Sequence, residues 1–362
     1  MLHLYFSFSI SLYSDIPAGA AWTKLNVGQY GYYRVNYPLE DWATFSQLMI
    51  DDMNALSISD RTSLLNDAFS LAAGNRLIYS TALGLTKYLT NERDLAPWQV
   101  TVGSLGYFSD VFYYSKVYPN LIKYERELVD ALYNDLGWED EGDFETKQLR
   151  TTILNVACSA GNTDCLTTAG NKFLGWKNDD DFIPPNFRSI VYNYGMKTVG
   201  NQETWDWMFD KYMAEQNAQE KLKLMRGLTC STDAWILYQF IQMAKDISIV
   251  REQDYFTLLT YISYNRIGEP LVWDFVRSEW EYLVDRFTLN DRALGKLIPS
   301  ITSKFSTEQR LKEMNDFFAD YPNAGAGENY RDIALETVTN NIKFVAAYTD
   351  VINDWLVDNT AK

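Results

Sequence analysis

With 362 residues, of which 47% are hydrophobic and 15% aromatic, the chain has enough apolar material to bury a large core, and this composition argues against disorder. Its 32 Lys and Arg residues are scattered and are outnumbered by 48 Asp and Glu residues, which gives a formal net charge of -16. Because nucleic-acid binding depends on clustered cations, no nucleic-acid partner is expected.

Residues 1–14 contain no Lys, Arg, Asp or Glu, and the small residues "AGA" follow at positions 18–20. Such a pattern is typical of a signal peptide with its cleavage site, which would make residues 1–20 a signal-like start. No cation precedes the apolar stretch, however, and its "FSFSIS" segment alternates as an edge strand does. A signal peptide and a strand both remain open for this segment.

The segment "WTKLNVGQYGYYRVNY", residues 22–37, holds five aromatic side chains. On either side of a turn at residues 28–31, alternate residues share one face: Thr23, Leu25 and Val27, then Tyr33, Val35 and Tyr37. This period of two predicts a β-hairpin. Two strands alone are marginal in water, so the hairpin needs further support, and its aromatic side chains are interpreted as packing residues rather than as a ligand platform.

From Pro38 onward the hydrophobic period becomes that of helices. One helix is predicted to begin at a cap provided by Ser59 or Asp60 and to end at Gly74, with a buried stripe of Leu64, Leu65, Ala68, Phe69 and Ala72. A second is predicted within "LVWDFVRSEWEYLVDRF", with a stripe of Trp273, Val276, Trp280, Leu283, Val284 and Phe287.

Helix stops recur along the chain, at Gly74, Gly161 and Gly200, with weaker versions at Cys230 and Gly268. The last four are separated by about 39, 30 and 38 residues, within the range of two-helix repeats. We therefore predict a mainly α fold, an irregular HEAT-like α-solenoid over residues 38–362, preceded by an N-terminal part at residues 1–37 that contains the β-hairpin. Two loops, residues 177–189 and 319–332, are interpreted as connections between repeats.

The chain contains three cysteines, Cys158, Cys165 and Cys230. Cys158 and Cys165 flank a predicted helix stop, so a disulfide between them could clip a helical hairpin, although two reduced core cysteines remain the alternative. Cys230 has no evident partner and is interpreted as a free core thiol. A disulfide would indicate an oxidising compartment.

The search for catalytic motifs is negative. His3 is the only histidine, which excludes a Ser-His-Asp system or a multi-histidine zinc site from the helical part of this chain. The sequence also lacks H-E-x-x-H, phosphate-binding and nucleophile-elbow motifs. No catalytic residue, metal ligand or cofactor is therefore predicted in this chain.

One basic residue is placed against local preference. In "TLNDRALGKLI" the natural cap is Asn290 or Asp291, which puts Arg292 in the first turn, where the helix dipole disfavours a cation. A residue that breaks a local rule can be functional, although an ordinary surface arginine is the alternative.

Several long segments together resemble the C-terminal region of the zinc aminopeptidases related to aminopeptidase N, most closely their glutamyl members. They are residues 22–37, "LSISDRTSLLNDAFSLA", the stretch from "REQDYFTLL" to "LNDRALGKLI", and "FSTEQRLKEMNDFFADYPNAGAGENYRD". The resemblance covers roughly residues 20–358 and implies that the hairpin is a remnant of a small β-sandwich domain. The remainder is similar to a bowl of short helices that covers a thermolysin-like catalytic domain.

The resemblance also implies specific roles. The zinc motif and the substrate-amine motif of the family are absent here, so zinc is expected only in the full-length enzyme. Arg292 matches an arginine that faces the catalytic cavity and would bind the peptide substrate through charge-assisted hydrogen bonds. The pair Cys158 and Cys165 resembles a short disulfide of secreted members, which favours an ectoenzyme or a secreted protein.

These observations predict the C-terminal domain of a zinc aminopeptidase, which shapes peptide binding and is not catalytic by itself. Its expected partners are a peptide substrate and the catalytic domain of the same enzyme, with a homodimer also possible. The alternative is a stand-alone helical-repeat module for peptide binding or dimerisation.

Overall fold

The computed structural model describes residues 20–360 of the chain. Within this range lie 17 α-helices and five short 3-10 helices, and the range contains no β-strand. The prediction of a mainly helical fold is confirmed. The signal-like start predicted for residues 1–20 lies outside the described residues except for Ala20, and so does His3.

The chain divides into two compact units between Tyr88 and Leu89. The elements of the first unit are the 3-10 turns Val27–Gln29 and Met53–Ala55 and the helices α1 (Leu39–Asp52), α2 (Ile58–Ala73) and α3 (Tyr79–Gly84). A further 3-10 helix, Leu85–Asn91, spans the division. The domain boundary predicted at residues 37 and 38 lies within the first unit and stays a prediction.

The predicted hairpin at residues 22–37 is not formed. Two backbone N–H groups of this segment donate instead to carboxylates of α2: Gly28, in the predicted turn, to Asp60 at 2.8 Å, and Val35, in the predicted second strand, to Asp67 at 3.0 Å. Because α2 already satisfies these two donors, they are not available to a strand partner. The segment has an irregular backbone with one 3-10 turn, Val27–Gln29.

The aromatic residues of this segment fall into two groups. The ring of Tyr37 packs edge-on against Phe45 at 5.0 Å, and Trp22 approaches the same ring at 6.2 Å. These two follow the packing interpretation. The side chains of three others are exposed, namely Tyr30, Tyr32 and Tyr33. For those three the packing interpretation is wrong in this structure.

Helix α2 follows its predicted pattern closely. All five residues of the predicted stripe are buried, and Gly74 ends the helix as its C-cap. The cap at its start is Ser57, whose side chain accepts a hydrogen bond from the Asp60 backbone, so the helix begins earlier than the predicted caps Ser59 and Asp60.

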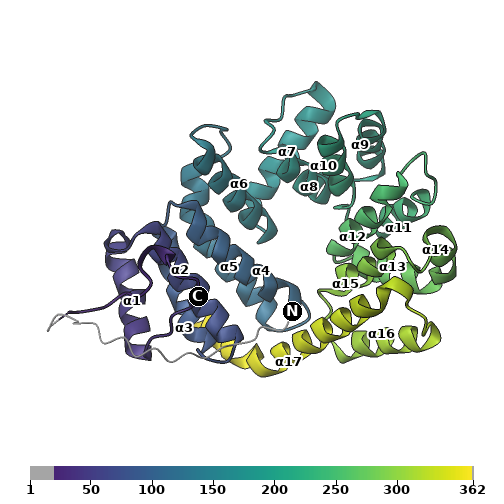
Figure 1. The fold of residues 1–362 in the computed structure, drawn as a ribbon. Helices are drawn as coiled ribbons and strands as arrows, with labels where there is room; N and C mark the ends of the chain where they lie inside the picture. The colour runs from purple at the N-terminus through teal and green to yellow at the C-terminus, as the bar shows by residue number, and fades with distance from the viewer. Residues whose placement is uncertain (1–19, 361–362) are drawn as a thin grey trace. The chain divides into compact units, whose positions relative to one another are not determined.

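The second unit contains the remaining helices (Figure 1). In chain order they are α4 (Leu95–Val111), α5 (Val117–Leu136), α6 (Phe144–Ser159), α7 (Thr163–Asp179), α8 (Arg188–Val199), α9 (Gln202–Ala214), α10 (Ala218–Leu228), α11 (Ala234–Met243), the 3-10 turn Glu252–Asp254, α12 (Tyr255–Tyr264), α13 (Gly268–Ser278), α14 (Trp280–Phe287), α15 (Arg292–Thr302), α16 (Glu308–Asp320), the 3-10 turn Gly325–Gly327 and α17 (Glu328–Asn359).

Within the second unit, most helices pack against their neighbours in sequence, as α5 does on α6, α7 on α8, and α12 on α13. This arrangement is typical of an irregular helical array. Helix α17 departs from it, because it packs against α15 and α16 and also against α5 (Figure 1). It thereby joins the last helices of the unit to one of the first.

Two predicted helix boundaries in this unit differ from the structure. The predicted helix around residues 273–287 is divided at Glu279 into α13 and α14, although five of the six stripe residues are still buried and only Val284 is not. Gly268 begins α13 rather than ending a helix. By contrast, Gly161 follows α6 at a φ of +76°, as a helix stop requires.

Candidate functional site: a charged cavity in the second unit

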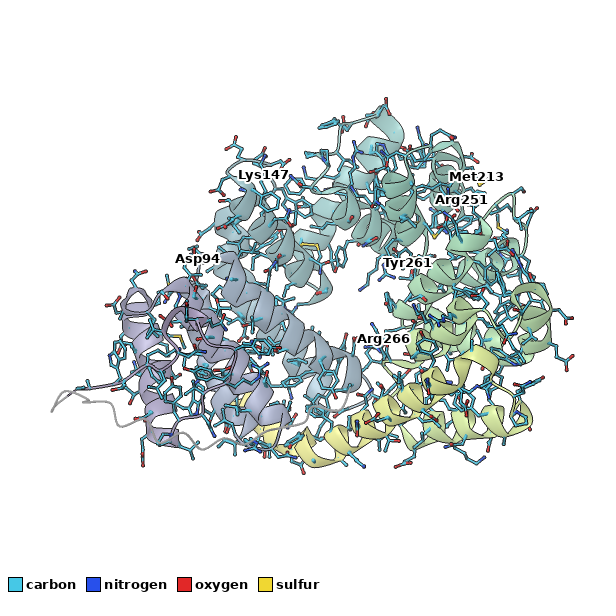
Figure 2. All side chains as sticks on the ribbon, viewed as in Figure 1. Asp94, Lys147, Met213, Arg251, Tyr261 and Arg266 are labelled. Carbon is cyan, nitrogen blue, oxygen red and sulfur yellow. A yellow bond between two sulfur atoms is a disulfide. The ribbon has the colours of Figure 1, made fainter. Side chains whose placement is uncertain are left out.

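A cavity of about 650 Å³ lies within the second unit. Side chains from α4, α5, α6, α8 and α10 line it, together with the connection between α12 and α13 and the residue Lys304 that follows α15. Figure 2 shows Tyr261 and Arg266 on the inner side of this unit, whereas Lys147 lies at its outer edge. The residues that line the cavity thus come from parts of the chain that are far apart in sequence.

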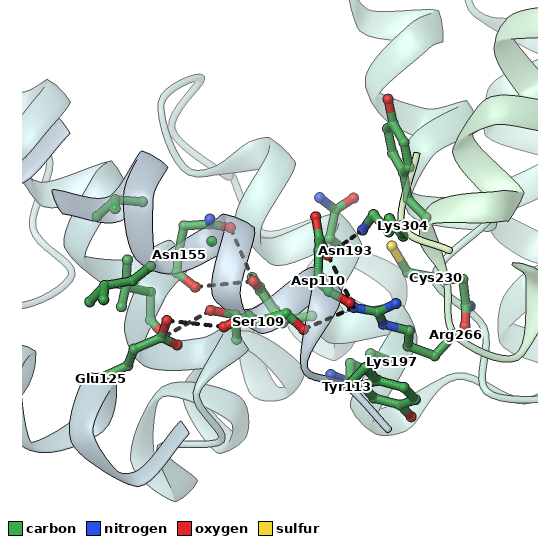
Figure 3. Close-up of a pocket in the computed structure, with 18 of the residues that line it drawn as sticks. Ser109, Asp110, Tyr113, Glu125, Asn155, Asn193, Lys197, Cys230, Arg266 and Lys304 are labelled. Atoms are coloured by element: carbon green, nitrogen blue, oxygen red, sulfur yellow. Dashed lines mark hydrogen bonds and ion pairs between the residues drawn. The ribbon is translucent and has the colours of Figure 1, made fainter. Parts of the chain in front are cut away.

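The carboxylate of Asp110, near the end of α4, forms ion pairs with two cationic side chains in the cavity wall (Figure 3). The guanidinium of Arg266 lies 3.1 Å from its carboxylate, and the ammonium of Lys304 lies 2.9 Å from it. Arg266 also stacks 4.2 Å above the ring of Tyr113. Burial lowers the pKa of Lys304, and the Asp110 carboxylate opposes this effect.

A second acidic group extends this cluster away from the cavity. The buried Glu269 carboxylate lies 3.6 Å from Arg266 and 3.7 Å from Arg310. Burial raises the pKa of Glu269, while the nearby arginines counteract part of this rise. Arg310 also pairs with Glu313 at 2.8 Å. The cluster thus connects α4 with α13 and α16 through alternating charges.

Two further cations line the cavity from α8 and α10. Arg226 donates a hydrogen bond of 2.8 Å to the backbone carbonyl of Tyr261 and lies 4.9 Å above the ring of Tyr264. Among the described residues, neither Arg226 nor the exposed Lys197 forms an ion pair with a carboxylate. An anionic ligand group is the natural complement of such cations.

Glu125 provides a buried acid on a different side of the cavity (Figure 3). Its side chain comes from α5, and the Ser109 hydroxyl donates a hydrogen bond of 3.1 Å to it. Burial raises the pKa of Glu125 to about 7, although the hydrogen bond from Ser109 works against this rise. Glu125 is therefore poised to be partly protonated near neutral pH.

The cavity as a whole is lined by four cations and two acids, although the entire chain is strongly acidic. Its lining also contains four tyrosines: Tyr113, Tyr118, Tyr194 and Tyr264. Cationic groups beside aromatic rings suit a peptide, which offers carbonyl, carboxylate and apolar groups together. The arrangement of these residues can therefore bind a ligand that carries both charged and apolar groups.

The predicted disulfide is present. Cys158 at the end of α6 and Cys165 in the first turn of α7 are bonded, with their Cα atoms 5.2 Å apart. Asn162 caps α7 by accepting a hydrogen bond from the Cys165 backbone, which turns the chain between the two helices. Cys230 is a free thiol, and burial raises its pKa.

Removal of the disulfide is expected to destabilise the second unit modestly. In the double variant Cys158→Ala/Cys165→Ala, the unfolding free energy should fall by about 2 kcal/mol, since the bond closes a short loop in the unfolded chain. Urea titrations of the two proteins under oxidising conditions measure this difference. Cys230→Ala serves as the control, and an equal loss in that variant would contradict the assignment.

Arg292 is the first residue of α15 and is exposed. Asp291 caps this helix by accepting a hydrogen bond of 2.7 Å from the Ala293 backbone, as one of the two predicted caps. Arg292 is not among the residues that line the cavity, and in the described part of the chain its guanidinium forms no ion pair. Its predicted contact with a peptide stays a prediction.

Comparison with known sequences places these features in a family. Residues 22–340 match the sequence model of a family described as the ERAP1-like C-terminal domain. The chain belongs to the ERAP1-like C-terminal domain family. The chain is also 40% identical over 347 residues to glutamyl aminopeptidase of Sus scrofa, and 39% identical over 347 residues to that of Homo sapiens. It is 40% identical over 344 residues to aminopeptidase A of Gloydius brevicauda.

These alignments cover 95% to 96% of this ERAP1-like chain. They cover a much smaller share of the relatives, because the chain spans 36% to 37% of their length. The resemblance stated from the sequence is thereby confirmed at the level of the family and of its similarity to glutamyl aminopeptidases.

The described residues of this ERAP1-like domain contain no group of three His, Cys, Asp or Glu side chains that could hold a metal ion. They therefore do not fit a zinc ion, and no step of zinc chemistry is assigned to them. A search of the same residues finds no helix long and apolar enough to span a membrane.

Sequence reasoning missed the cavity cluster of Asp110, Arg266 and Lys304. These residues occur in unremarkable local contexts, and Asp110 lies 156 positions from Arg266. The one available signal was that Arg266 sits in the short link "YNRIG" between two helices, where side chains of neighbouring repeats meet.

Proposed function

We propose that this chain acts as the C-terminal helical part of a zinc exopeptidase similar to glutamyl aminopeptidase, where it covers the catalytic cavity and shapes peptide binding. The observation that carries the proposal is the similarity to glutamyl aminopeptidase across 96% of the chain. Catalysis and zinc binding would reside in the part of such an enzyme that this chain does not match.

The cavity of the second unit supports a role in peptide binding. Arg226 and Lys197 offer two cations that have no carboxylate partner among residues 20–360. In addition, the buried side-chain oxygen of Asn193, which also lines the cavity, has no hydrogen-bond partner there. A peptide can supply both the anion and the N–H donor that these groups lack.

Arg292 is the proposed contact outside this cavity. Its exposed guanidinium would donate charge-assisted hydrogen bonds to a carbonyl or carboxylate of the peptide that occupies the catalytic cavity. The three exposed tyrosines of the first unit are proposed to face the upstream β-sandwich domain of the same enzyme.

The disulfide supports a location in an oxidising compartment, and we place the protein outside the cell as an ectoenzyme or a secreted form. Homodimerisation remains a further prediction. A stand-alone peptide-binding module is the second candidate, favoured by the fact that the cavity lies entirely within the second unit of this chain.

Arg292→Ala is expected to weaken peptide binding by about tenfold, since it removes a charge-assisted hydrogen bond. The probe is a hexapeptide that begins with glutamate and carries a fluorophore at its C-terminus, and its anisotropy is titrated with the purified chain. Lys296→Ala, which removes another exposed cation of α15, should leave the affinity unchanged. Equal affinities for all three proteins, or no saturable binding by any of them, would overturn the proposed peptide contact.

A further inference from the structure

The start of α15 rests on a turn that is distant in sequence. The turn comprises residues 323–327, "NAGAG", between α16 and α17. Its Ala326 backbone donates a hydrogen bond of 2.9 Å to the carbonyl of Leu289, which lies three residues before Arg292. The loop that leads into α15 is therefore tied directly to this turn.

Gly325 allows this close approach. It adopts a φ of +53°, which favours glycine, and a Cβ at this position would lie 2.4 Å from the Leu289 carbonyl oxygen and 2.7 Å from the Leu289 Cβ. Neither atom belongs to the flexible end of a side chain. Any larger residue at position 325 must therefore displace the loop that carries Leu289.

A second pair of glycines brings α15 itself against the turn. A Cβ on Gly295 would lie 2.9 Å from the Cα of Gly327, and a Cβ on Gly327 would lie 3.3 Å from the Cα of Gly295. The first turn of the helix thus touches the 323–327 turn through backbone atoms, without an intervening side chain that could adjust.

The loop before α15 is itself in an uncommon conformation. Thr288 has a φ of 65° and a ψ of 149°, where a β-branched residue is strained. Its N–H donates to the Val284 carbonyl at 2.8 Å, and its carbonyl accepts from Asp291 at 3.2 Å. Such a conformation persists only where the surroundings impose it. The contact between Leu289 and Ala326 is one such constraint.

We propose that Gly325 is a positioning residue for Arg292: the 323–327 turn holds the loop at residues 288–291, and this loop sets where the first residue of α15 presents its guanidinium. The proposal rests on the function proposed above for Arg292. In the absence of this constraint, the strained loop is expected to relax and to move the start of α15.

The test compares two glycines that share the same positive φ. Gly137, in the connection between α5 and α6, also has a φ of +53°, but a Cβ there would meet no atom within 4 Å. Gly137→Ala therefore carries the backbone penalty without a clash, whereas Gly325→Ala carries both. Gly325→Asn adds a residue that tolerates positive φ and retains the clash.

The first readout is hydrogen exchange of two backbone amides. The N–H of Asp291 donates a hydrogen bond to the Thr288 carbonyl, and the N–H of Ala293 donates one to the Asp291 side chain. We expect about tenfold faster exchange in Gly325→Ala and Gly325→Asn, and no change in Gly137→Ala. Unchanged exchange in the two Gly325 variants, or an equal acceleration in Gly137→Ala, overturns the positioning role whatever the peptide assay gives.

The second readout is the affinity for the glutamate-initiated hexapeptide. Gly325→Ala should lose about tenfold, and the double variant Gly325→Ala/Arg292→Ala should bind no more weakly than Arg292→Ala alone. A loss in Arg292→Ala without a loss in Gly325→Ala refutes this inference and keeps the proposed function. An unchanged affinity in Arg292→Ala refutes the proposed function instead.

Discussion

At pH 8 the Glu125→Gln variant is expected to be more stable than the unsubstituted chain by about 3 kcal/mol. The reason is the burial of Glu125, which raises the pKa of its carboxyl group from 4.5 to about 7. The folded protein therefore binds the proton more tightly than the unfolded chain does. Ionisation of this group costs the folded state free energy that a neutral amide of the same shape does not cost.

The direction of the pH dependence follows from this raised pKa. Below pH 4.5 the carboxyl group is protonated in both states, so it imposes no penalty. Between pH 4.5 and about 7 the unfolded chain loses the proton while the folded protein keeps it, and stability falls with rising pH. Above pH 7 both forms are ionised, and the full penalty is present.

Urea titrations at pH 4.5 and pH 8 measure the difference between the two proteins. The gap should shrink from about 3 kcal/mol at pH 8 to less than about 0.5 kcal/mol at pH 4.5. The hydrogen bond from Ser109 survives in the variant, because the glutamine carbonyl still accepts it. Glu281→Gln, an exposed substitution on α14, is the control and should change stability by less than about 0.5 kcal/mol at either pH.

A gap that is equal at the two pH values would show that the gain in Glu125→Gln comes from packing rather than from the removal of a buried charge. A variant less stable than the unsubstituted chain at pH 8 would mean that the ionised Glu125 has a compensating partner. Either result would also show that Glu125 does not change its charge in the cavity near neutral pH.

The parts of the fold that depend on local sequence were predictable. The buried stripe of α2, its end at Gly74 and the stop at Gly161 each follow from residues within one or two helical turns. The bond between Cys158 and Cys165 could be anticipated for the same reason, since a single short turn separates the two helices that carry them.

The hairpin at residues 22–37 was predicted wrongly because alternation does not reveal which partner satisfies the backbone. The backbone N–H groups of Gly28 and Val35 donate to the carboxylates of Asp60 and Asp67. The period of residues 22–37 gives no indication that these two carboxylates lie nearby. Tertiary hydrogen bonds from α2 therefore overrode a pattern that fits a strand.

The candidate site residues also comprise one that the local sequence indicated and a cluster that it did not. Arg292 was singled out because a local rule, the preference of helix N-termini for acidic residues, is broken there. The cavity cluster of Asp110, Arg266 and Lys304 breaks no local rule, and it exists only because distant helices of the array come together. Long-range charge pairing of this kind has no signature in a single sequence.

Asn341→Ala is expected to lower the unfolding free energy by about 4 kcal/mol. Asn341 lies in α17 with 3% of its surface exposed. Its side-chain amide donates hydrogen bonds of 2.9 Å to the carbonyls of Ser303 and Phe305, and its oxygen accepts one of 3.2 Å from the Tyr107 hydroxyl. Alanine leaves the buried Phe305 carbonyl, the Ser303 carbonyl and the Tyr107 hydroxyl without this partner.

Urea titration measures the loss, with Asn353→Ala as the control on the same helix. Asn353 accepts one hydrogen bond of 3.0 Å from Asn120 at a half-buried site, so its removal should cost less than about 1 kcal/mol. Asn341→Asp tests the chemistry further, because a carboxylate cannot donate to the Ser303 and Phe305 carbonyls. An aspartate variant as stable as the unsubstituted chain would contradict the donor role.

The size of this effect reflects the place of Asn341 in the second unit. The three groups that it binds belong to α4 and to the segment after α15, which carry Asp110 and Lys304 into the cavity wall. Loss of Asn341 should therefore loosen the helices that hold the cavity charges together. Hydrogen exchange of the α4 amides is expected to rise in Asn341→Ala by more than that of the α9 amides, and to stay unchanged in Asn353→Ala. An equal rise in α4 and α9 would indicate a loss of stability spread over the whole unit instead.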